Sequence, residues 1–483
     1  MAVEPTPGYD LQPSATQIPT ATNYITDFNF LNQYLPDTYE KEFERYGNRT
    51  IASFLRLVGA EMPSNSDLIK WAEQGRLHTK YTNVGLAPLV AAANATFQVN
   101  DNLTPAGSTA GALGTPSIAI RVGQTVMVVK NDGSGSNKGI VTAVPTANTF
   151  TVAFYEAAGF TGGSAIGNAD VSVFIYGSEF KKGTVGMQGS LEADDIILDN
   201  SPIILKDKYA VSGSDMAQIG WIEVTTENGA NGYLWYLKSE HETRLRFDDY
   251  LETAMIEAVP AEAAGGGLAQ SGAQAAGFKG SEGIFYSVEN RGNVWSGGNP
   301  VALADFDAII SRLDKQGSIE ENVIFLDRQF GFDIDDMLAA QNSYGAGGTS
   351  YGLFDNDEEM ALNLGFTGFR RGYDFYKSDW KYLNDPTMRG GLPTGAGSGR
   401  VNGLLVPAGS TTVYDQILGK NAKRPFLHVR YRASETEDRR YKTWITGSAG
   451  GARTSDLDAM EVNFLSERAV CTLGANNFFL FQE

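Results

Sequence analysis

Apolar and polar positions alternate along residues 123–156, GQTVMVVKNDGSGSNKGIVTAVPTANTFTVAFYE, with a Gly/Ser/Asn-rich break after the first run. Alternation with a period of two predicts half-buried strands, and the break predicts a hairpin loop. The runs SIAIRV (117–122) and VSVFIY (171–176) extend the pattern to five short strands. Five strands separated by turn signals predict a small β-barrel, with a spacing similar to that of SH3-type barrels.

Charge separates this stretch from its surroundings. Between Val84 and Tyr176 there are three basic and four acidic residues, whereas the preceding segment, 37–80, is half as long and much more charged. The shift predicts that 84–176 is a small β-barrel domain inserted into the chain.

Helical spacing dominates before and after the insert. Residues 37–83 read as helical, with apolar positions spaced from Phe43 to Val58, and SNSDLIKWAEQG (64–75) predicts a helix that stops at Gly75. The strongest helix is predicted from Leu234 to Val259, about 40 Å long, and Pro260 ends it.

Two apolar stripes are expected along this long helix. One follows Leu234, Leu237, His241, Leu245, Met255 and Val259, and the other follows Phe247, Tyr250, Ala254 and Ala258. We therefore expect Leu245 to be deeply buried, with Glu242 and Glu252 on the solvated side.

The remaining segments differ in composition. Residues 1–36 contain no Lys or Arg and five prolines, which predicts an extended arm; 177–210 reads as two extended segments around a loop, and hence as a long hairpin that carries the barrel. The Gly/Ala-rich part of 261–300 predicts a loop.

Asn299 and Pro300 then begin a predicted helix that ends at Gly317. Its inward residues are Leu303, Phe306, Ile309, Ile310 and Leu313. The buried strand NVIFLD and the helix RQFGFDIDDMLAAQ follow it. The C-terminal part, 426–483, is β-rich.

Composition narrows the class of protein. The formal net charge is −19, and no Lys/Arg cluster offsets it. This charge disfavours a protein that binds nucleic acid through its phosphates. It is compatible with a protein shell around an enclosed polyanion. The N-terminal sequence lacks the features of a signal peptide, and no apolar run is long enough to span a membrane. Cys471, the single cysteine, lies in the apolar run AVCTL and is expected to be a buried, inert thiol. We expect the chain to be made and folded in a cytosol.

Candidate chemistry is sparse. His78, His241 and His428 share no ligand spacing, and GSGSNKG (133–139) lacks the ending and the helix of a phosphate loop. Two acidic groups are weak candidates for a cation site. The ordinary interpretation is that their carboxylates lie at a helix start or on the surface. The first group is Asp327, Asp333, Asp335 and Asp336, and the second is Asp355, Asp357, Glu358 and Glu359. We expect no catalytic, cofactor-binding or metal-binding residues and no enzymatic activity.

The order of elements resembles that of the major capsid proteins of tailed bacteriophages. The unit ALADFDAIISRLDKQGSIEENVIFLDRQFGFDIDDMLAA resembles the start of their axial domain, and SERAVCTLGANNFFLFQ resembles their final peripheral-domain strand pair. The helix GYLWYLKSEHETRLRFDDYLETAMIEA fits their spine helix, and Gly-rich β inserts occur in this class. In style the chain is closest to capsid proteins of crAss-like gut phages.

This resemblance implies an α+β chain with an HK97-like capsid fold: a long spine helix, an extended β-hairpin arm, axial and peripheral domains, and the inserted small β-barrel. The implied segments are an N-terminal arm (1–36), a helical part of the peripheral domain (37–83), the barrel (84–176), the rest of the extended loop (177–210), the spine (211–260), the Gly-rich loop (261–300), the axial domain (301–425) and the C-terminal peripheral strands (426–483).

The resemblance also implies a function. The chain would assemble with itself, as hexamers and pentamers, into an icosahedral shell that encloses double-stranded DNA, beside portal, scaffold or decoration proteins. It would be made in the host cytoplasm and located in the virion, and the barrel would contact a neighbouring subunit, decorate the outer face or act as a spacer. Alternatives are a tail or collar protein, a glycoside hydrolase with a β accessory module, or a polysaccharide-binding adhesin.

Overall fold

The computed structural model describes residues 60–75, 80–86, 93–99, 118–157, 159, 171–190, 195–217, 224–225, 231–232, 235–261, 271–342, 368–393, 399–415, 420–451 and 453–483. The predicted arm (1–36) and the predicted helix from Phe43 to Val58 lie outside these residues. The chain divides into two compact units, a body formed by 1–71 and 199–483 and a barrel unit formed by 72–198.

The barrel unit contains six strands rather than five. They are β3 (Lys80–Leu86), β4 (Asn94–Val99), β5 (Gln124–Lys130), β6 (Ser136–Thr146), β7 (Thr149–Phe154) and β8 (Val171–Ser178). They close in the order β3-β4-β7-β6-β5-β8 around a core in which Phe97 stacks on Phe150 with ring centroids 5.6 Å apart. The predicted limits of Val84 and Tyr176 therefore cut into the first and last strands.

The described part of the segment SIAIRV, residues 118–122, does not form a strand. Its backbone donors bond outside the ladder: the amides of Ile118 and Ala119 donate to the Ala147 carbonyl and the Tyr81 hydroxyl, at 3.0 and 2.8 Å. Its isoleucines still pack against the barrel core. The apolar alternation therefore predicted the burial of this segment correctly. The described residues are not a strand because these backbone amides do not bond to the backbone of a neighbouring strand.

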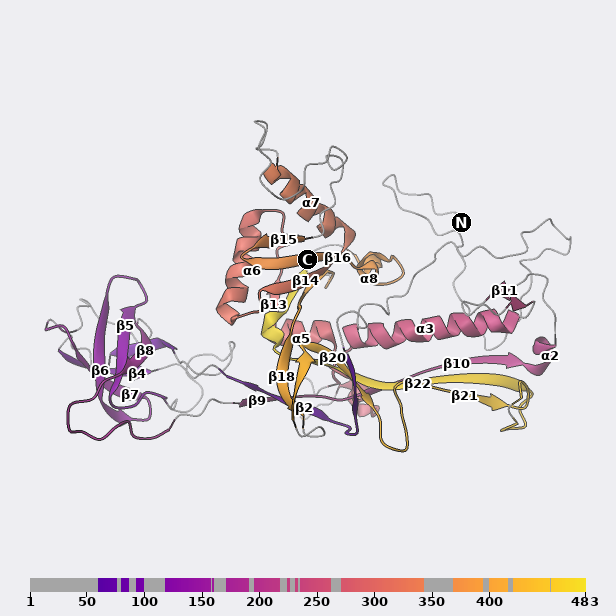
Figure 1. Cartoon of the computed structure of the whole chain (residues 1–483), viewed down its shortest axis with the longest axis horizontal. Helices are drawn as coiled ribbons and strands as arrows, with labels where there is room; N and C mark the ends of the chain where they lie inside the picture. Colours follow the sequence, from indigo (N-terminus) through magenta and orange to yellow (C-terminus); the bar gives the residue numbers. More distant parts are fainter. Residues whose placement is uncertain are drawn as a thin grey trace. The chain divides into compact units, whose positions relative to one another are not determined.

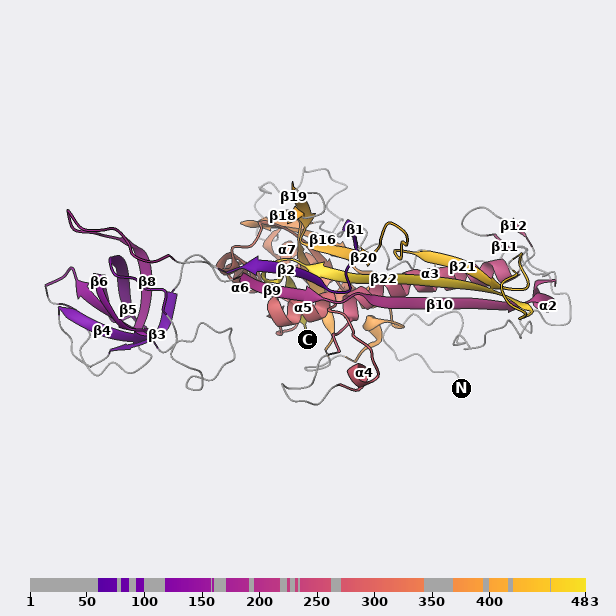
Figure 2. The same ribbon diagram turned by 90° about the horizontal axis from the view of Figure 1, so that it is seen from below.

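One sheet of the body is built on the long strand β22 (Ala459–Thr472). Its order is β1-β20-β22-β10, and β21 also pairs with β22; Figure 2 shows β10, β21 and β22 running together. The other bounds are β1 (Ala60–Ser64), β20 (Leu427–Arg432), β10 (Ile203–Ser212) and β21 (Lys442–Gly447). The predicted long hairpin is not formed by β9 (Asp195–Asn200) and β10, since β9 pairs with β2 (Ile69–Gln74) and β10 pairs with β22.

The predicted helix over 64–75 is also wrong. The structure has β1 and β2 there, separated by a turn in which the Ser66 hydroxyl accepts from the Leu68 amide at 3.2 Å. Ile69 and Trp71, two positions apart, both pack toward Cys471. Serine here closes a turn rather than capping a helix, and the two apolar residues fit a period of two.

The predicted long helix is present as α3 (Trp235–Glu257), which packs along β10 and β22 (Figure 1). Its buried stripe differs from both predicted ones, because Phe247, Leu251 and Met255 face the body, one turn apart, while Leu245 is only half-buried. Glu242 is exposed as expected, whereas Glu252 is buried. The helix lies on a sheet, and the i, i+4, i+8 set that starts at Phe247 forms the buried stripe.

The second sheet of the body has six strands in the order β13-β23-β17-β14-β16-β15. Their bounds are β13 (Asn293–Trp295), β14 (Glu321–Leu326), β15 (Gly368–Arg371), β16 (Tyr373–Asp379), β17 (Val401–Pro407) and β23 (Phe479–Gln482). The buried strand predicted at NVIFLD is therefore confirmed as β14, inside this sheet. SERAVCTLGANNFFLFQ is not a strand pair, since β22 and β23 lie in different sheets.

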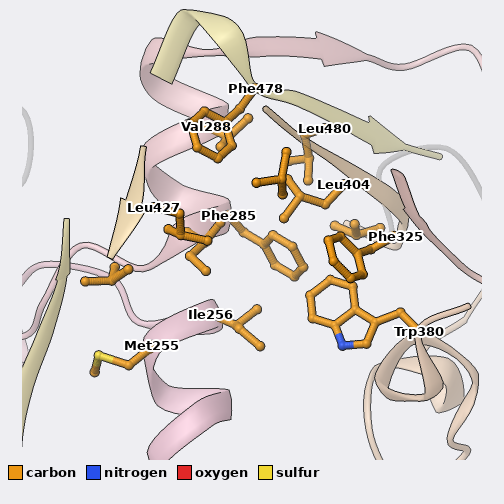
Figure 3. Packing of buried hydrophobic residues seen from close by; sticks show 14 of the residues in the cluster. Met255, Ile256, Phe285, Val288, Phe325, Trp380, Leu404, Leu427, Phe478 and Leu480 are labelled. Carbon is orange, nitrogen blue, oxygen red and sulfur yellow. The ribbon is translucent and has the colours of Figure 1, made fainter. Parts of the chain in front are cut away.

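Both faces of this second sheet are covered. On one face, Ile324, Leu405 and Phe481 pack against α6 (Leu303–Gln316) and α7 (Arg328–Asn342). On the other, Phe325 and Leu404 pack with α5 (Ile284–Arg291), the end of α3 and Trp380 beside α8 (Lys381–Asn384), as Figure 3 shows. This second core also contains Leu427 and Val470 of the first sheet, so it joins the two sheets.

Two predictions in this region need correction. Residues 261–300 are not only a loop, because α5 and β13 lie within them and α5 buries Ile284, Phe285 and Val288. Helix α6 begins after Ala302 rather than at Asn299, and Asp305 accepts from the amides of Val301 and Ala302. The inward face predicted for α6 and the Gly317 stop, at φ 67°, are confirmed.

The remaining elements are short. They are α2 (Gly213–Met216), α4 (Gly272–Ala275), the 3-10 turns at Arg389–Gly391 and Ala475–Asn477, the pair β11 (Val224–Thr225) with β12 (Asn231–Gly232), and the pair β18 (Ser410–Asp415) with β19 (Lys420–Pro425).

Candidate assembly surfaces

Two of the three histidines lie among the described residues, and they are on different elements. His241 lies on α3, and His428 is buried on β20 with Nδ1 3.3 Å from the Pro425 carbonyl oxygen. His78 is outside the described residues. Across the part of the chain that the structure describes, no group of three or more His, Cys, Asp or Glu side chains is placed to hold a metal ion.

The first acidic group forms a helix start. Asp327 is buried before α7, where its Oδ1 accepts from the Phe330 amide at 2.7 Å and its Oδ2 lies 3.4 Å from Arg400 Nη2. Burial raises the pKa of the Asp327 carboxyl, against the lowering effects of that amide and of Arg400. This is the helix-start role that the sequence predicted for an aspartate at this point.

The other acidic residues of the first group have separate partners. Asp335 pairs with Lys377 at 2.7 Å, Asp333 accepts from the Asn299 side-chain amide at 2.7 Å, and Asp336 is exposed. Asp355, Asp357, Glu358 and Glu359 lie outside the described residues. The first group is thus distributed over packing contacts.

The glycine loop and the cysteine have structural roles. Gly133, at φ 74°, lies in the hairpin turn between β5 and β6, and residues 136–139 already belong to β6. Cys471 is buried beside Ile69 and Ala469, and burial raises the pKa of its thiol to about 12. Within the described residues, no helix combines the length and the apolar character needed to cross a bilayer.

An open depression of about 460 Å³ lies where β20 meets the loop after it. Its charged side chains pair with each other: Glu467 contacts Arg439 at 2.5 Å and Arg432 at 3.2 Å, and Arg432 also pairs with Asp67. Because both arginines already have carboxylate partners, these contacts fasten the strands together.

Strand β9 exposes isoleucines on both of its faces. Ile196 and Ile197 are 55% and 69% exposed, and consecutive strand residues point in opposite directions. Among the described residues, β9 pairs only with β2, in a two-stranded sheet. We call this pair the β2–β9 ribbon. A two-stranded ribbon is marginal by itself in water, so apolar residues on both faces indicate a segment that is covered from both sides.

Comparisons with known proteins add structural likenesses. No family model matches the chain, and the search of curated proteins gave no match. Among solved structures, the chain is similar to one from Microbacterium phage Oxtober96, with 9% identity, a TM-score of 0.39 and coverage of 92% of this chain and 95% of that one. It is also similar to a chain of the capsid of a native GTA particle, with 9% identity, a TM-score of 0.36 and coverage of 92% and 94%.

A third similar structure is the capsid of the cyanophage P-SCSP1u, with 9% identity, a TM-score of 0.33 and coverage of 78% of this chain and 91% of that one. Phage capsids are therefore among the structures that this chain resembles. All three TM-scores are below 0.5, so these likenesses alone assign neither a fold family nor a function to the chain.

Proposed function

We propose that this protein is a structural subunit that assembles with itself into the icosahedral shell of a tailed bacteriophage and encloses the packaged DNA. The observation that carries the proposal is the β2–β9 ribbon, whose isoleucines face outward on both sides. The sequence resemblance to major capsid proteins, including the long helix α3, points to the same function.

In a shell, neighbouring subunits can cover both faces of this ribbon, which a single chain leaves exposed. Burial of apolar surface contributes about 25 cal/mol per Å², and a ribbon between neighbouring subunits buries both faces. Each such contact is weak, but a closed shell repeats it in every subunit, so the contacts add up through multivalency. The same segment in an isolated chain exposes two isoleucines at a cost in solubility.

The acidic composition fits an enclosing wall. With a net charge of −19, the chain repels a polyanion and leaves enclosed DNA free to move. Hexamers and pentamers are the proposed building blocks, and portal, scaffold or decoration proteins are the proposed partners. The protein is then made in the host cytoplasm and located in the virion, and we assign it no enzymatic activity.

The test is assembly of the full chain, expressed with any scaffold it needs and examined by negative-stain microscopy. The wild type should give hexamers, pentamers or closed shells. The double variant Ile196→Ser/Ile197→Ser should remain as small soluble species with an unchanged Tm, because it removes only exposed apolar surface. Val185→Ser is the matched control, since Val185 is 74% exposed but outside the ribbon, and it should assemble normally.

Assembly of the double variant with the yield of the wild type would contradict the role of the ribbon. A wild type that stays monomeric under every condition would contradict a shell subunit. Open rings or tubes in place of closed shells would favour the alternative of a tail or collar protein.

A further inference from the structure

The barrel carries an exposed aromatic patch on the outer face of β8, β5 and β6. Phe174 and Tyr176 on β8 point outward and are 44% and 45% exposed, and Tyr155, just after β7, is 51% exposed. Strand pairing makes the patch continuous, since Phe174 is opposite Met127 on β5, Met127 is opposite Lys138 on β6, and the Tyr155 amide donates to the Lys138 carbonyl oxygen at 3.1 Å. These five residues define the aromatic patch; Figure 1 shows their strands side by side.

Contacts within the patch hold its side chains in place. The Lys138 ammonium lies 5.7 Å from the centroid of the Tyr176 ring, and the Tyr155 hydroxyl donates to Glu179 Oε2 at 2.5 Å. The barrel core is filled from the opposite direction by Val126, Val128 and Val173. The outward aromatic residues are therefore not needed to fill the barrel. Exposed Tyr and Phe beside a half-buried Met on a rigid strand surface have the composition of the centre of a protein interface.

Charge indicates the partner. Residues 72–198 contain seven basic and nine acidic residues, whereas the rest of the chain contains 31 basic and 48 acidic ones. The barrel unit is thus almost neutral, and the body carries nearly all of the negative charge. The patch itself presents Lys138, and the exposed Lys181 and Lys182 follow Glu179 closely in sequence.

We propose that the aromatic patch binds the acidic body of another copy of this chain, with Lys138 facing carboxylates of that copy. The inference rests on the proposed function, because a shell places bodies and barrels of neighbouring subunits side by side. Apolar contact supplies most of the affinity, and the lysines select an acidic partner and fix the register. Like-charged bodies repel, and a nearly neutral insert with cations beside aromatic residues offsets this repulsion where subunits meet.

The test is a zero-length carbodiimide crosslink from Lys138 in assembled particles. Particles made from a mixture of unlabelled and 15N-labelled full-length chains distinguish links within one copy from links between copies by mass spectrometry. We expect Lys138 to be linked to body carboxylates of a different copy, with loss of this link at high salt. The patch variant Phe174→Ser/Tyr176→Ser keeps Lys138 but should lose the link, whereas Thr142→Ala, an exposed β6 residue outside the patch, should keep it.

The outcomes separate the two proposals. Closed shells in which Lys138 is linked only within its own copy overturn this inference and leave the shell function intact. Soluble oligomers without shells that still show the link between copies support the patch contact and contradict the shell. If the patch variant does not fold, the isotope-mixed wild type alone decides. A neutral polysaccharide in a native gel tests a glycan as the alternative partner. If it retards the wild type and Thr142→Ala but not the patch variant, and no links between copies form, the inference is overturned in favour of a glycan.

Discussion

Phe247 on helix α3 stacks on Phe464 of strand β22, with ring centroids 5.7 Å apart and ring planes at 30°. Tyr441 packs edge-on against both rings, at 5.4 Å from Phe247 and 6.4 Å from Phe464. This cluster fixes the face that α3 turns toward the sheet, and it decides which helix substitutions matter.

Phe247→Ala should lower the free energy of unfolding by about 3–5 kcal/mol, because it leaves a cavity between helix and sheet. Leu245→Ala, at a half-buried position, should cost about 1 kcal/mol, and Tyr250→Ala, at a residue 48% exposed, should cost less. Chemical denaturation of the three variants measures the order. Equal losses for Phe247→Ala and Leu245→Ala would show that the buried stripe is misplaced.

Asp327→Asn should change the pH dependence of stability. The pKa of Asp327 is raised in the folded state, so the folded wild type binds the proton more tightly than the unfolded chain does. The wild type therefore loses stability as pH rises from about 4, the usual aspartate pKa, through the folded value. Asn keeps an oxygen that can accept from the Phe330 amide but does not ionise.

The Tm of Asp327→Asn, relative to the wild type, should therefore rise between about pH 4 and pH 7. Asp336→Asn is the control, because it removes an exposed carboxylate from the same helix and so tests whether the effect belongs to the buried position. A difference for Asp327→Asn that falls with pH would mean that pairing with Arg400 outweighs burial.

Cys471 should not react with thiol reagents in the folded protein. Its pKa of about 12 leaves almost no thiolate at about pH 8, and the side chain is buried. Labelling with a thiol reagent should be complete in denaturant and negligible without it. Rapid labelling of the native chain would show that the sheet opens near β22.

Replacement of residues 76–194 by a short Gly/Ser linker should leave the body folded. The barrel strands close on themselves around their own core, and β2 and β9 pair at the point where the chain enters and leaves the insert. Calorimetry should still show a cooperative transition for the body. Insoluble protein at every temperature would indicate that the body depends on the barrel.

Long, strongly periodic elements were predictable from the sequence. Helix α3, helix α6 with its Gly317 stop, and the apolar strand β14 follow from local pattern alone. Local pattern did not identify which stripe of α3 is buried, because that depends on Phe464 and Tyr441, about 200 residues downstream. The strand β2 was missed for a similar reason, since its partner β9 lies beyond the barrel.

The candidate surfaces left weaker signals in the sequence. The adjacent Ile196 and Ile197 in DDIILD form an apolar run on an otherwise charged strand, which indicates burial on both faces. In VSVFIY every position except the serine is apolar or aromatic, so the outward Phe174 and Tyr176 stand out once the barrel is assumed. Neither signal shows which molecule covers the exposed side chains, because the partner is not encoded in local pattern.

The position of β23 in the six-stranded sheet has a consequence for synthesis on the ribosome. Strand β23 joins β13 to β17, so the six-stranded sheet stays incomplete until Phe479–Gln482 leaves the exit tunnel. The barrel strands, Lys80 to Ser178, are contiguous apart from their loops and can close much earlier in translation. A nascent chain therefore carries a finished barrel on an unfinished body. This order delays a complete six-stranded sheet until β23 has emerged, so a chain that stops before Phe479 keeps an open core in the body.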